Sequence, residues 1–291
     1  MPERTLVGRF SGGFAGGKFE TELEAYKAAS EADIAPKLHF SDVESKFMLT
    51  DFISNDFKFR PDSGWFFKTA GEQLKKFHSL DVKAEEGTIF TFLQPLFQKT
   101  TDLADPFGTS ENLKECKAAL MILEKTFSEK VKERVLVHGD MNPANILAIL
   151  EMHLKIIDYE TTRKGYASFD LATLGAFSIF DEFKSMTLLE AYYGRAPNEV
   201  EIAKYTLMRV PALLLSTLGL TVASQLKEKP GEEVMKKYPT DFAKFHAEIG
   251  NGNIPFGPEI FYPLAAATAT QALKERQSEK YKMALELLQQ Q

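Results

Sequence analysis

The sequence predicts an α+β fold in which a small β-rich part precedes a large, mainly helical part. Short apolar runs typical of strands fill the start of the chain, whereas helical patterns dominate from Gly64 onward. Two further apolar runs, Ile146–Leu150 and Leu154–Ile157, interrupt the helical part and predict a hairpin. We therefore expect two parts, residues 1–53 and residues 54–291.

The first part contains three predicted strands and one predicted helix. Thr5–Phe10 has the composition of a strand, and Phe19–Ala32 repeats apolar residues at helical spacing. Lys37–Phe40 and Lys46–Phe52 predict two more strands, separated by the polar turn Ser41–Ser45. Together these elements predict a small β-rich lobe.

The second part is predicted to be helical around the hairpin. Its helical segments are Trp65–His78, Asn112–Lys132, Phe169–Phe180, Tyr205–Leu226 and Leu264–Gln289. With 291 residues and 44% hydrophobic content, the chain can bury a substantial core. This length is consistent with one large domain or with two lobes.

Composition and charge exclude several functional classes. The net charge is −6, and the chain has no basic run of the kind that binds nucleic acid. The single cysteine, Cys116, excludes an internal disulfide framework and a cysteine-based metal site. Four histidines, at positions 39, 78, 153 and 246, are scattered without metal-ligand spacing, and we expect most of them at the surface or in packing.

The chain is expected to be cytoplasmic and not inserted in a membrane. No positively charged, apolar signal sequence opens it. The longest apolar run, Val210–Ala223, is interrupted by polar residues and by Pro211, and it is too short to span a bilayer.

The strongest functional signal is the stretch Val135–Glu160, VLVHGDMNPANILAILEMHLKIIDYE. A short apolar strand ends at the loop that carries Asp140, and Asn145 then precedes the first strand of the hairpin. If the hairpin turns near residues 151–152, the start of one strand faces the end of the other. Asn145 and Asp158 then become neighbours.

These three side chains suit the chemistry of Mg-ATP. Mg²⁺ prefers a few hard oxygen ligands together with phosphate oxygens and water, so Asn145 and Asp158 are the candidate metal ligands. Asp140 lies on the preceding loop, where it could accept a proton from an attacking hydroxyl. The alternative is purely structural, with Asp140 in a turn and the other two residues at strand ends.

The order and spelling of these motifs resemble the choline/ethanolamine kinase and aminoglycoside phosphotransferase families, which have a protein-kinase-like fold. HGDMNPAN stands where protein kinases have the HRD loop, IDYE stands where they have DFG, and Phe169-Asp170-Leu171-Ala172 follows. The resemblance implies a phosphotransferase with an alcohol group as acceptor, which uses ATP and Mg²⁺ to phosphorylate a small-molecule hydroxyl. It favours an amino-alcohol such as choline or ethanolamine and leaves aminoglycosides or other small molecules open. The oligomeric state is not specified.

Roles in the small lobe follow from the same resemblance. Arg9 on the first strand is the candidate for holding phosphates, and Glu22 on the following helix is its candidate ion-pair partner. Asp51, Phe52 and Ile53 resemble the hinge, whose backbone would bind adenine. The alternative is that Arg9 is a solvated strand residue and Glu22 one of several acids on the helix surface.

The small lobe is shorter than the resemblance implies, because few residues precede its first strand. Two strands and a phosphate-covering loop normally come ahead of that strand. Residues 1–53 would form this shortened N-lobe, and residues 54–291 the helical C-lobe with the catalytic loop and the metal site. Three explanations stand: a reduced lid, a start internal to a longer reading frame, or a non-catalytic kinase-like binding protein.

A glycine-rich run, GGFAGGKF at residues 12–19, nearly fits the phosphate loop G-x-x-x-x-G-K-[ST]. It departs at Phe19, which has no hydroxyl for Mg²⁺, and the chain lacks the alternation of strands and helices that builds a parallel sheet. We favour a flexible connection that could cover phosphates. A P-loop nucleotide hydrolase, with Lys18 in its loop, is the third alternative.

Substrate contacts are the least specified part of the prediction. Glu160 lies two residues after Asp158 and could face a cationic amine or assist a second metal. Choline kinase relatives hold a quaternary ammonium against aromatic faces, which Tyr192 or Tyr193 could supply here. Asp170 is expected to cap its helix or to partner the catalytic loop, as it does in the family.

Overall fold

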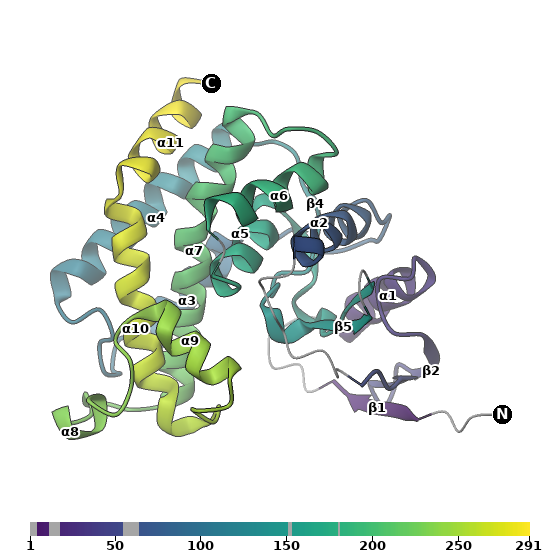
Figure 1. The fold of residues 1–291 in the computed structure, drawn as a ribbon, viewed down its shortest axis with the longest axis horizontal. Coiled ribbons are helices and arrows are strands. Elements are labelled where there is room, and N and C mark those ends of the chain that lie inside the picture. The colour runs from purple at the N-terminus through teal and green to yellow at the C-terminus, as the bar shows by residue number, and fades with distance from the viewer. Residues whose placement is uncertain (1–4, 12–17, 55–63, 151–152, 180) are drawn as a thin grey trace. The chain divides into compact units, whose positions relative to one another are not determined.

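The computed structural model describes residues 5–11, 18–54, 64–150, 153–179 and 181–291 (Figure 1). Within them helices dominate and three small antiparallel sheets complete the fold, which confirms the predicted α+β class. The chain divides into two compact units, each built from two separate segments. The first unit comprises Met1–Gly87 and Arg134–Pro197, and the second comprises Thr88–Glu133 and Asn198–Gln291. The predicted division at residue 53 stays a prediction.

A three-stranded antiparallel sheet opens the first unit. β1 (Leu6–Phe10) and β2 (Leu38–Asp42) both pair with β3 (Phe47–Asp51), so the strand order is β1-β3-β2. The register sets Arg9 opposite Met48, whose side chain is buried. All three strands were predicted, with small differences at their ends.

One face of α1 (Phe19–Glu31) is buried in the same unit. Apolar residues recur on this face at three- and four-residue spacing, among them Leu23 and Tyr26. Glu22 lies on the buried face as well, with only 2% of its surface exposed. It is therefore not one of the surface acids of this helix.

Short strands position the central motif. β4 (Val135–Val137) pairs with β7 (Arg163–Gly165), and β5 (Ile146–Leu150) pairs with β6 (His153–Ile156) as the predicted hairpin. The hairpin turn at residues 151–152 lies outside the described residues, as does most of the glycine-rich run.

Three helices complete the first unit: α2 (Gly64–His78), α5 (Ala167–Phe177) and α6 (Glu182–Tyr193). α5 is buried along nearly its whole length, whereas α2 and α6 pack against each other. The two helices approach closely at Gly71, where a Cβ would lie 2.5 Å from the Leu188 carbonyl oxygen. Any larger residue at this crossing would push the helices apart.

The second unit is helical. Its elements are α3 (Ile89–Lys99), α4 (Ser110–Lys130), α7 (Glu199–Ser224), α8 (Glu232–Met235), α9 (Phe242–Gly250), α10 (Pro258–Gln277) and α11 (Glu279–Gln290). α7 packs against α10, α11 and α3. In the part of the chain that is described, α7 is the one helix long and apolar enough to cross a bilayer, and 61% of its most apolar window is buried. Packing on three other helices explains its apolar composition.

One predicted helix is wrong, and others are incomplete. The predicted helix Leu264–Gln289 is two helices, because Ser278 takes an extended conformation and its side chain caps the Tyr281 amide of α11. α7 begins well before the predicted Tyr205, at a capping box formed by Asn198. Seven elements have no counterpart in the prediction: α3, α6, α8, α9, β7 and the two short 3-10 helices η1 (Pro143–Asn145) and η2 (Tyr159–Thr161).

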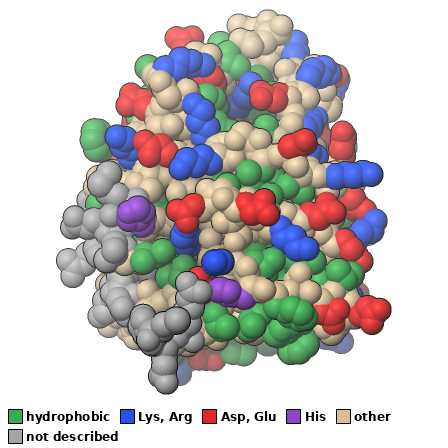
Figure 2. Space-filling model, turned by 90° about the vertical axis from the view of Figure 1, so that its right-hand side faces the viewer, with side chains coloured by type: hydrophobic (Ala, Val, Ile, Leu, Met, Phe, Trp, Pro, Cys, Tyr) green, Lys and Arg blue, Asp and Glu red, His purple; other side chains and the backbone are tan. Residues whose placement is uncertain are grey.

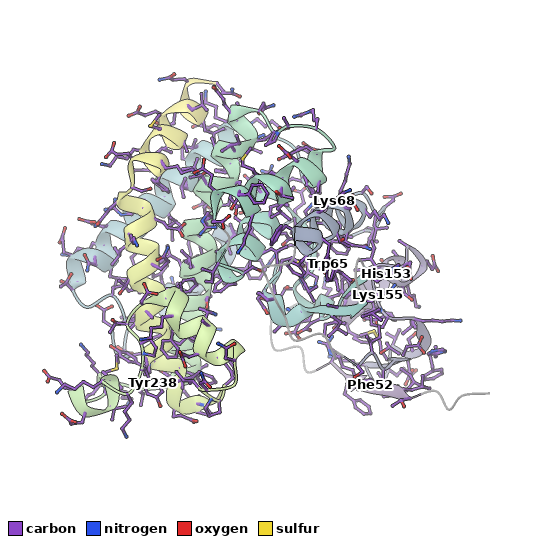
Figure 3. All side chains as sticks on the ribbon, in the orientation of Figure 1. Phe52, Trp65, Lys68, His153, Lys155 and Tyr238 are labelled. Carbon is purple, nitrogen blue, oxygen red and sulfur yellow. The ribbon has the colours of Figure 1, made fainter. Side chains whose placement is uncertain are left out.

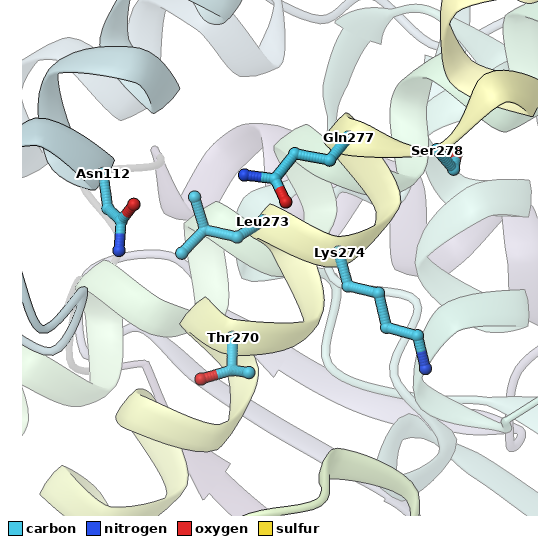
Figure 4. Close-up of a pocket in the computed structure, with 6 residues that line it drawn as sticks. All are labelled: Asn112, Thr270, Leu273, Lys274, Gln277 and Ser278. Atoms are coloured by element: carbon cyan, nitrogen blue, oxygen red, sulfur yellow. The ribbon is translucent and has the colours of Figure 1, made fainter.

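On the face drawn in Figure 2, Lys and Arg side chains lie interspersed with Asp and Glu side chains. Elsewhere, a hollow of about 630 Å³ opens beside α10 (Figure 4) and is lined by Asn112, Thr270, Leu273, Lys274, Gln277 and Ser278. Leu273 and Gln277 point toward Asn112 of α4, whereas Lys274 points away. This hollow belongs to the second unit and contains none of the predicted site residues, so we locate the candidate site by its chemistry.

Candidate active site

The loop that follows β4 is held by Asp170 of α5. The amides of His138 and Gly139 donate to the two carboxylate oxygens of Asp170, at 2.7 and 2.9 Å. Asp170 is completely buried. Burial works to raise its pKa, but hydrogen bonds from His78 and Gly139 lower the pKa below the usual value, so the group stays charged. Asp170 is thus a hydrogen-bond partner of the loop that carries Asp140.

Gly139 is required by the geometry of this loop. Its φ is +84°, in the left-handed region that favours glycine. A Cβ at this position would lie 2.7 Å from the Thr161 carbonyl oxygen and 2.7 Å from Arg163 Nη2. The loop therefore packs tightly on the segment that follows Asp158.

Two asparagines orient Asp140. The Asn142 side-chain nitrogen donates to Asp140 Oδ1 at 2.9 Å. The Asn145 side-chain nitrogen donates to Asp140 Oδ2 at 3.0 Å and to the Asp140 carbonyl oxygen at 2.8 Å. Both carboxylate oxygens accept a hydrogen bond, so the plane of the group is fixed while Asp140 stays partly open to solvent.

The hairpin brings Asn145 and Asp158 together. The Ile157 amide donates to the Asn145 carbonyl oxygen at 3.0 Å, one residue before Asp158. Asp158 has φ +70° and ψ +66°, a left-handed conformation that is uncommon for residues other than glycine. Its side chain is 37% exposed, so the carboxylate is open to a ligand.

Arg9 lies among three acids. Its Nη1 atom is 2.8 Å from Glu22 Oε1, and its Nη2 atom is 2.7 Å from Asp158 Oδ1 and 3.4 Å from Glu160 Oε2. The contact with Glu22 is an ion pair without hydrogen-bond geometry, whereas Asp158 accepts a hydrogen bond. One guanidinium thus compensates the negative charge of the α1 acid and that of the two acids that follow β6.

Two of the three predicted hinge residues use their amides within the sheet. The amides of Asp51 and Phe52 donate to main-chain oxygens beside β2 and β1, at 2.9 and 3.0 Å. The Phe52 ring is exposed (Figure 3), and the Asp51 carboxylate lies 2.6 Å from His39 Nε2. Among the described residues, Ile53 is the predicted hinge position whose amide has no main-chain partner.

Tyr192 lies near the end of α6, against the last residue of α2. Its hydroxyl is 2.9 Å from His78 Nδ1, and its ring meets the rings of His78 and Tyr193 edge-on. His78 Nε2 is in turn 2.9 Å from Asp170 Oδ2. The structure therefore places Tyr192 two hydrogen bonds away from Asp170, the hydrogen-bond partner of the loop.

Comparison with protein families decides the relationship. The family model described as the phosphotransferase enzyme family, APH, matches residues 18–209, which is more than half of the chain. The chain belongs to this phosphotransferase family. The predicted resemblance is thereby confirmed, and the protein is a phosphotransferase.

Solved structures share the protein-kinase-like fold of this phosphotransferase. The chain is similar to a choline/ethanolamine kinase family protein from Mesorhizobium loti, with a TM-score of 0.73 and 16% identity, covering 98% of this chain and 87% of that one. For the choline kinase LicA from Streptococcus pneumoniae the TM-score is 0.62 at 17% identity, with 94% and 87% covered. For spectinomycin phosphotransferase APH(9)-Ia, solved with ADP and spectinomycin, it is 0.56 at 14% identity, with 92% and 87% covered. A comparison with curated protein sequences returned no match.

Burial shifts the pKa of two acids in the candidate site. Desolvation raises the pKa of Glu22, against the opposing effects of Arg9 and of the Ser11 hydroxyl, which donates to Glu22 at 2.9 Å. Burial also raises the pKa of Glu160, and the negative charge of Asp158 adds to this shift. Arg9 lowers the pKa of both acids and thus opposes the effect of burial.

The donor atoms of the site fit a magnesium ion. The side-chain nitrogen of Asn145 is engaged by Asp140, which directs the amide oxygen, a hard ligand, toward another partner. Asp158 adds a partly exposed carboxylate. Mg²⁺ takes one or two such protein ligands and completes its shell with phosphate oxygens and water. In the described residues no three His, Cys, Asp or Glu side chains cluster as metal ligands.

Three residues of this phosphotransferase site were not predicted: His78, Asn142 and Arg163. Arg163 is buried beside Gly139, and burial lowers its pKa to about 10, while the charge of Asp170 opposes the shift. It lies on the unpredicted strand β7, and His78 is 92 residues from its partner Asp170, so no local pattern linked either residue to the loop. His78 is buried among aromatic rings, as expected of a packing residue, but its hydrogen bond with Asp170 was not predicted. Asn142 could have been found, because it lies two residues after Asp140.

Proposed function

We propose that this phosphotransferase transfers the γ-phosphoryl group of ATP to a hydroxyl group of a small molecule. The observation that carries the proposal is the orientation of Asp140 by Asn142 and Asn145, directly beside the Asn145–Asp158 pair. A base held in a fixed orientation next to a metal site is what phosphoryl transfer to an alcohol requires.

In the proposed mechanism, Asp140 receives the proton of the attacking hydroxyl. The substrate oxygen forms a bond to the γ-phosphorus while the bond from that phosphorus to the bridging oxygen of ADP breaks, and the hydroxyl proton passes to a carboxylate oxygen of Asp140. Asn145 and Asp158 would hold Mg²⁺, which supplies positive charge to the phosphates.

Arg9 and Glu22 are assigned to the phosphates. Arg9 contacts Glu22 through one nitrogen and Asp158 through the other, so it can give up Asp158 and stay paired with Glu22. The released nitrogen can then bind a phosphate oxygen. Ile53 is the hinge position assigned to adenine, because the amides of Asp51 and Phe52 are already engaged.

A cationic substrate suits the charge of the site. The charges of Asp140 and Asp158 both act on Glu160, and Arg9 compensates only part of this negative charge. An amino-alcohol such as choline or ethanolamine combines one positive charge with one hydroxyl. We assign its amine to Glu160 and to the aromatic face of Tyr192. The cytoplasmic location stays a prediction.

Two alternatives rest on specific observations. An aminoglycoside-type substrate is also cationic and would be drawn by the same acids. A non-catalytic, nucleotide-binding protein is favoured by the contact between Arg9 and Asp158, since the carboxylate assigned to the metal already has a cation beside it.

Release of ADP from Mg-ATP, measured with choline, ethanolamine, other amino-alcohols, thiamine and aminoglycosides, tests the proposal. Asp140→Asn keeps the shape of the side chain and removes the base, so we expect kcat to fall by about 100-fold or more, while nucleotide affinity stays within about twofold. Asp102→Asn, which changes an exposed acid of the second unit, is the matched control.

The pattern of activity separates the three proposals. Turnover with amino-alcohols alone supports the first, and turnover with aminoglycosides alone supports the second. Nucleotide binding without substrate-dependent ADP release across the panel supports the binding protein. Turnover that Asp140→Asn leaves unchanged would contradict the role of Asp140.

A further inference from the structure

We propose that His78 is a positioning residue for the catalytic loop, acting through Asp170, and that the Tyr192 hydroxyl sets the hydrogen-bonding state of His78. The proposal rests on the proposed function, because it takes Asp140 as the base that the loop must place. It names two residues that touch none of the reacting atoms.

Asp170 receives three hydrogen bonds through its two oxygens. Gly139 N donates to Oδ1 at 2.9 Å, while His138 N and His78 Nε2 both lie within hydrogen-bond distance of Oδ2, at 2.7 and 2.9 Å. The Asp170 carboxylate is completely buried, and the His78 side chain is 2% exposed. Water therefore does not replace any of these donors, and each of them helps to fix where the carboxylate lies.

The arrangement determines which nitrogen of His78 carries a proton. An ionised carboxylate only accepts hydrogen bonds, so Nε2 must donate to Asp170. In a neutral imidazole the other nitrogen, Nδ1, is then an acceptor, and the Tyr192 hydroxyl at 2.9 Å is its donor. Tyr192 thus selects the form of His78 that donates to Asp170.

The chain of hydrogen bonds joins three helices to the loop. His78 is the last residue of α2, Tyr192 lies near the end of α6, and Asp170 lies in the first turn of α5. α2 and α6 are held together at Gly71. The positions of His78 and Tyr192 therefore follow from helix packing, which is more rigid than the loop that they position.

The loop is also held from its other side, which makes its position sensitive to Asp170. Thr161 Oγ1 donates to the His138 carbonyl oxygen at 2.7 Å, and His138 Nε2 lies 2.9 Å from the Ile157 carbonyl oxygen. Without the His78 contact, Asp170 keeps only the two loop amides as donors and loses its link to α2, which changes only one of the two attachments of the loop. The loop that carries Asp140 is then held less firmly, and a small misplacement of a base lowers the rate more than it lowers binding.

Three substitutions test this inference. Tyr192→Phe removes only the hydroxyl. It keeps the aromatic face, so the proposed contact with the substrate is retained. His78→Leu removes the donor to Asp170, and His78→Gln restores a donor nitrogen at a similar reach. Lys75→Met is the matched control, because Lys75 of α2 contacts the Tyr193 carbonyl oxygen at 3.5 Å but not the chain of hydrogen bonds.

We expect kcat to fall by about tenfold in Tyr192→Phe and by about 100-fold in His78→Leu, with KM for ATP and for the hydroxyl substrate nearly unchanged. His78→Gln should recover most of the loss, and Lys75→Met should behave as the wild type. A purely structural role would lower thermal stability in all three His78 and Tyr192 variants without a selective loss of kcat.

A second measurement does not depend on activity. In protein labelled with ¹⁵N-glycine, the Gly139 amide reports its hydrogen bond to Asp170, so its resonance should move in Tyr192→Phe and not in Lys75→Met. An unchanged resonance together with an unchanged kcat would overturn the inference. If the wild type shows no turnover at all, the proposed function fails while the Gly139 resonance still decides the hydrogen-bond chain. If His78→Leu does not fold, Tyr192→Phe and His78→Gln decide it.

Discussion

The guanidinium of Arg9 contacts the carboxylate that is assigned to magnesium. Arg9 and Asp158 are both about one-third exposed, and their atoms lie 2.7 Å apart. A pair with this exposure contributes about 1 kcal/mol at most, which a divalent cation can readily replace. On the proposed assignment, Arg9 and the metal would therefore compete for Asp158 until phosphates give Arg9 another partner.

Replacing Arg9 with Met should tighten metal binding in the absence of nucleotide. The change removes the competing cation from Asp158, so Mn²⁺ no longer has to replace an ion pair worth about 1 kcal/mol. Mn²⁺ should therefore bind up to about fivefold more tightly. ATP should bind more weakly, because one phosphate contact is lost. Titration of Mn²⁺ followed by electron paramagnetic resonance measures the first effect, and Lys18→Met, which removes a cation paired with Glu85, is the control. Equal Mn²⁺ affinity in Arg9→Met and wild type would contradict the competition.

Replacing Gly139 with Ala should damage both stability and turnover. An L-residue at φ +84° costs about 1–2 kcal/mol, and here its Cβ would also collide with Thr161 O and Arg163 Nη2. Gly108→Ala separates the two effects, because Gly108 has φ +78° and nothing within 4 Å of a Cβ. We expect Gly108→Ala to lower only stability in urea unfolding, and Gly139→Ala to lower stability further and kcat as well. A Gly139→Ala enzyme as active and stable as Gly108→Ala would contradict this packing.

The residues of the site were predictable where they share one short stretch of chain. Asp140, Asn145 and Asp158 are tied by a loop and a hairpin, and hairpin pairing alone brings the last two together. Arg163 and His78 were not predictable, because they reach the loop through tertiary packing. The residue types gave no local signal for either contact.

At the level of elements, the contact of α2 with α6 controls the end of each helix. Both helices carry one partner of the contact between His78 and Tyr192 in their last turn. Their axes can approach because Gly71 has no side chain at the crossing. Changes at this crossing should therefore alter the position of His78.

Replacing Gly71 with Ala should separate α2 from α6. Its Cβ would lie 2.5 Å from the Leu188 carbonyl oxygen, so the helices must shift, at a cost of about 1–3 kcal/mol. Gly219→Ala is the matched control, since Gly219 lies inside α7 with open space around a Cβ. There the better helix propensity of Ala should stabilise by about 0.5–1 kcal/mol. Thermal unfolding of the two variants should shift in opposite directions, and a shift in the same direction would contradict the close approach.

Helix ends were less predictable than helix faces. The apolar spacing of Leu264–Gln289 continues through Ser278, so periodicity gave no sign that the chain turns there. The turn depends on a backbone conformation and a capping hydrogen bond, and neither of them changes the spacing of the apolar residues. In α3, Pro95 obscured a helix, although the structure accommodates it inside Ile89–Lys99.

At the level of the whole molecule, stability should fall with acidification through His246 of α9. Burial lowers the pKa of His246 from 6.5 to about 4. Between pH 6.5 and pH 4, His246 is protonated in the unfolded chain but not in the folded chain. The free energy of unfolding therefore decreases as the pH falls, by roughly 3 kcal/mol in all. The group has no such effect above pH 6.5, where both states are neutral.

Urea unfolding at several pH values measures this dependence. His246→Leu should flatten the decline between pH 6.5 and pH 4, whereas His153→Gln, which changes an exposed histidine of β6, should leave it unchanged. A decline of the same size in His246→Leu and wild type would show that other groups cause it.

The interleaving of the two units has a consequence for synthesis on the ribosome. Residues 88–133 belong to the second unit, yet they are made between the two segments of the first. A nascent chain that has reached residue 133 carries Arg9 and Glu22, but it still lacks Asp158 and Asp170. Domains usually fold in the order in which they are made. Here the first unit can close only after Pro197 has emerged, when the first segment of the second unit, about one third of that unit, has already been made.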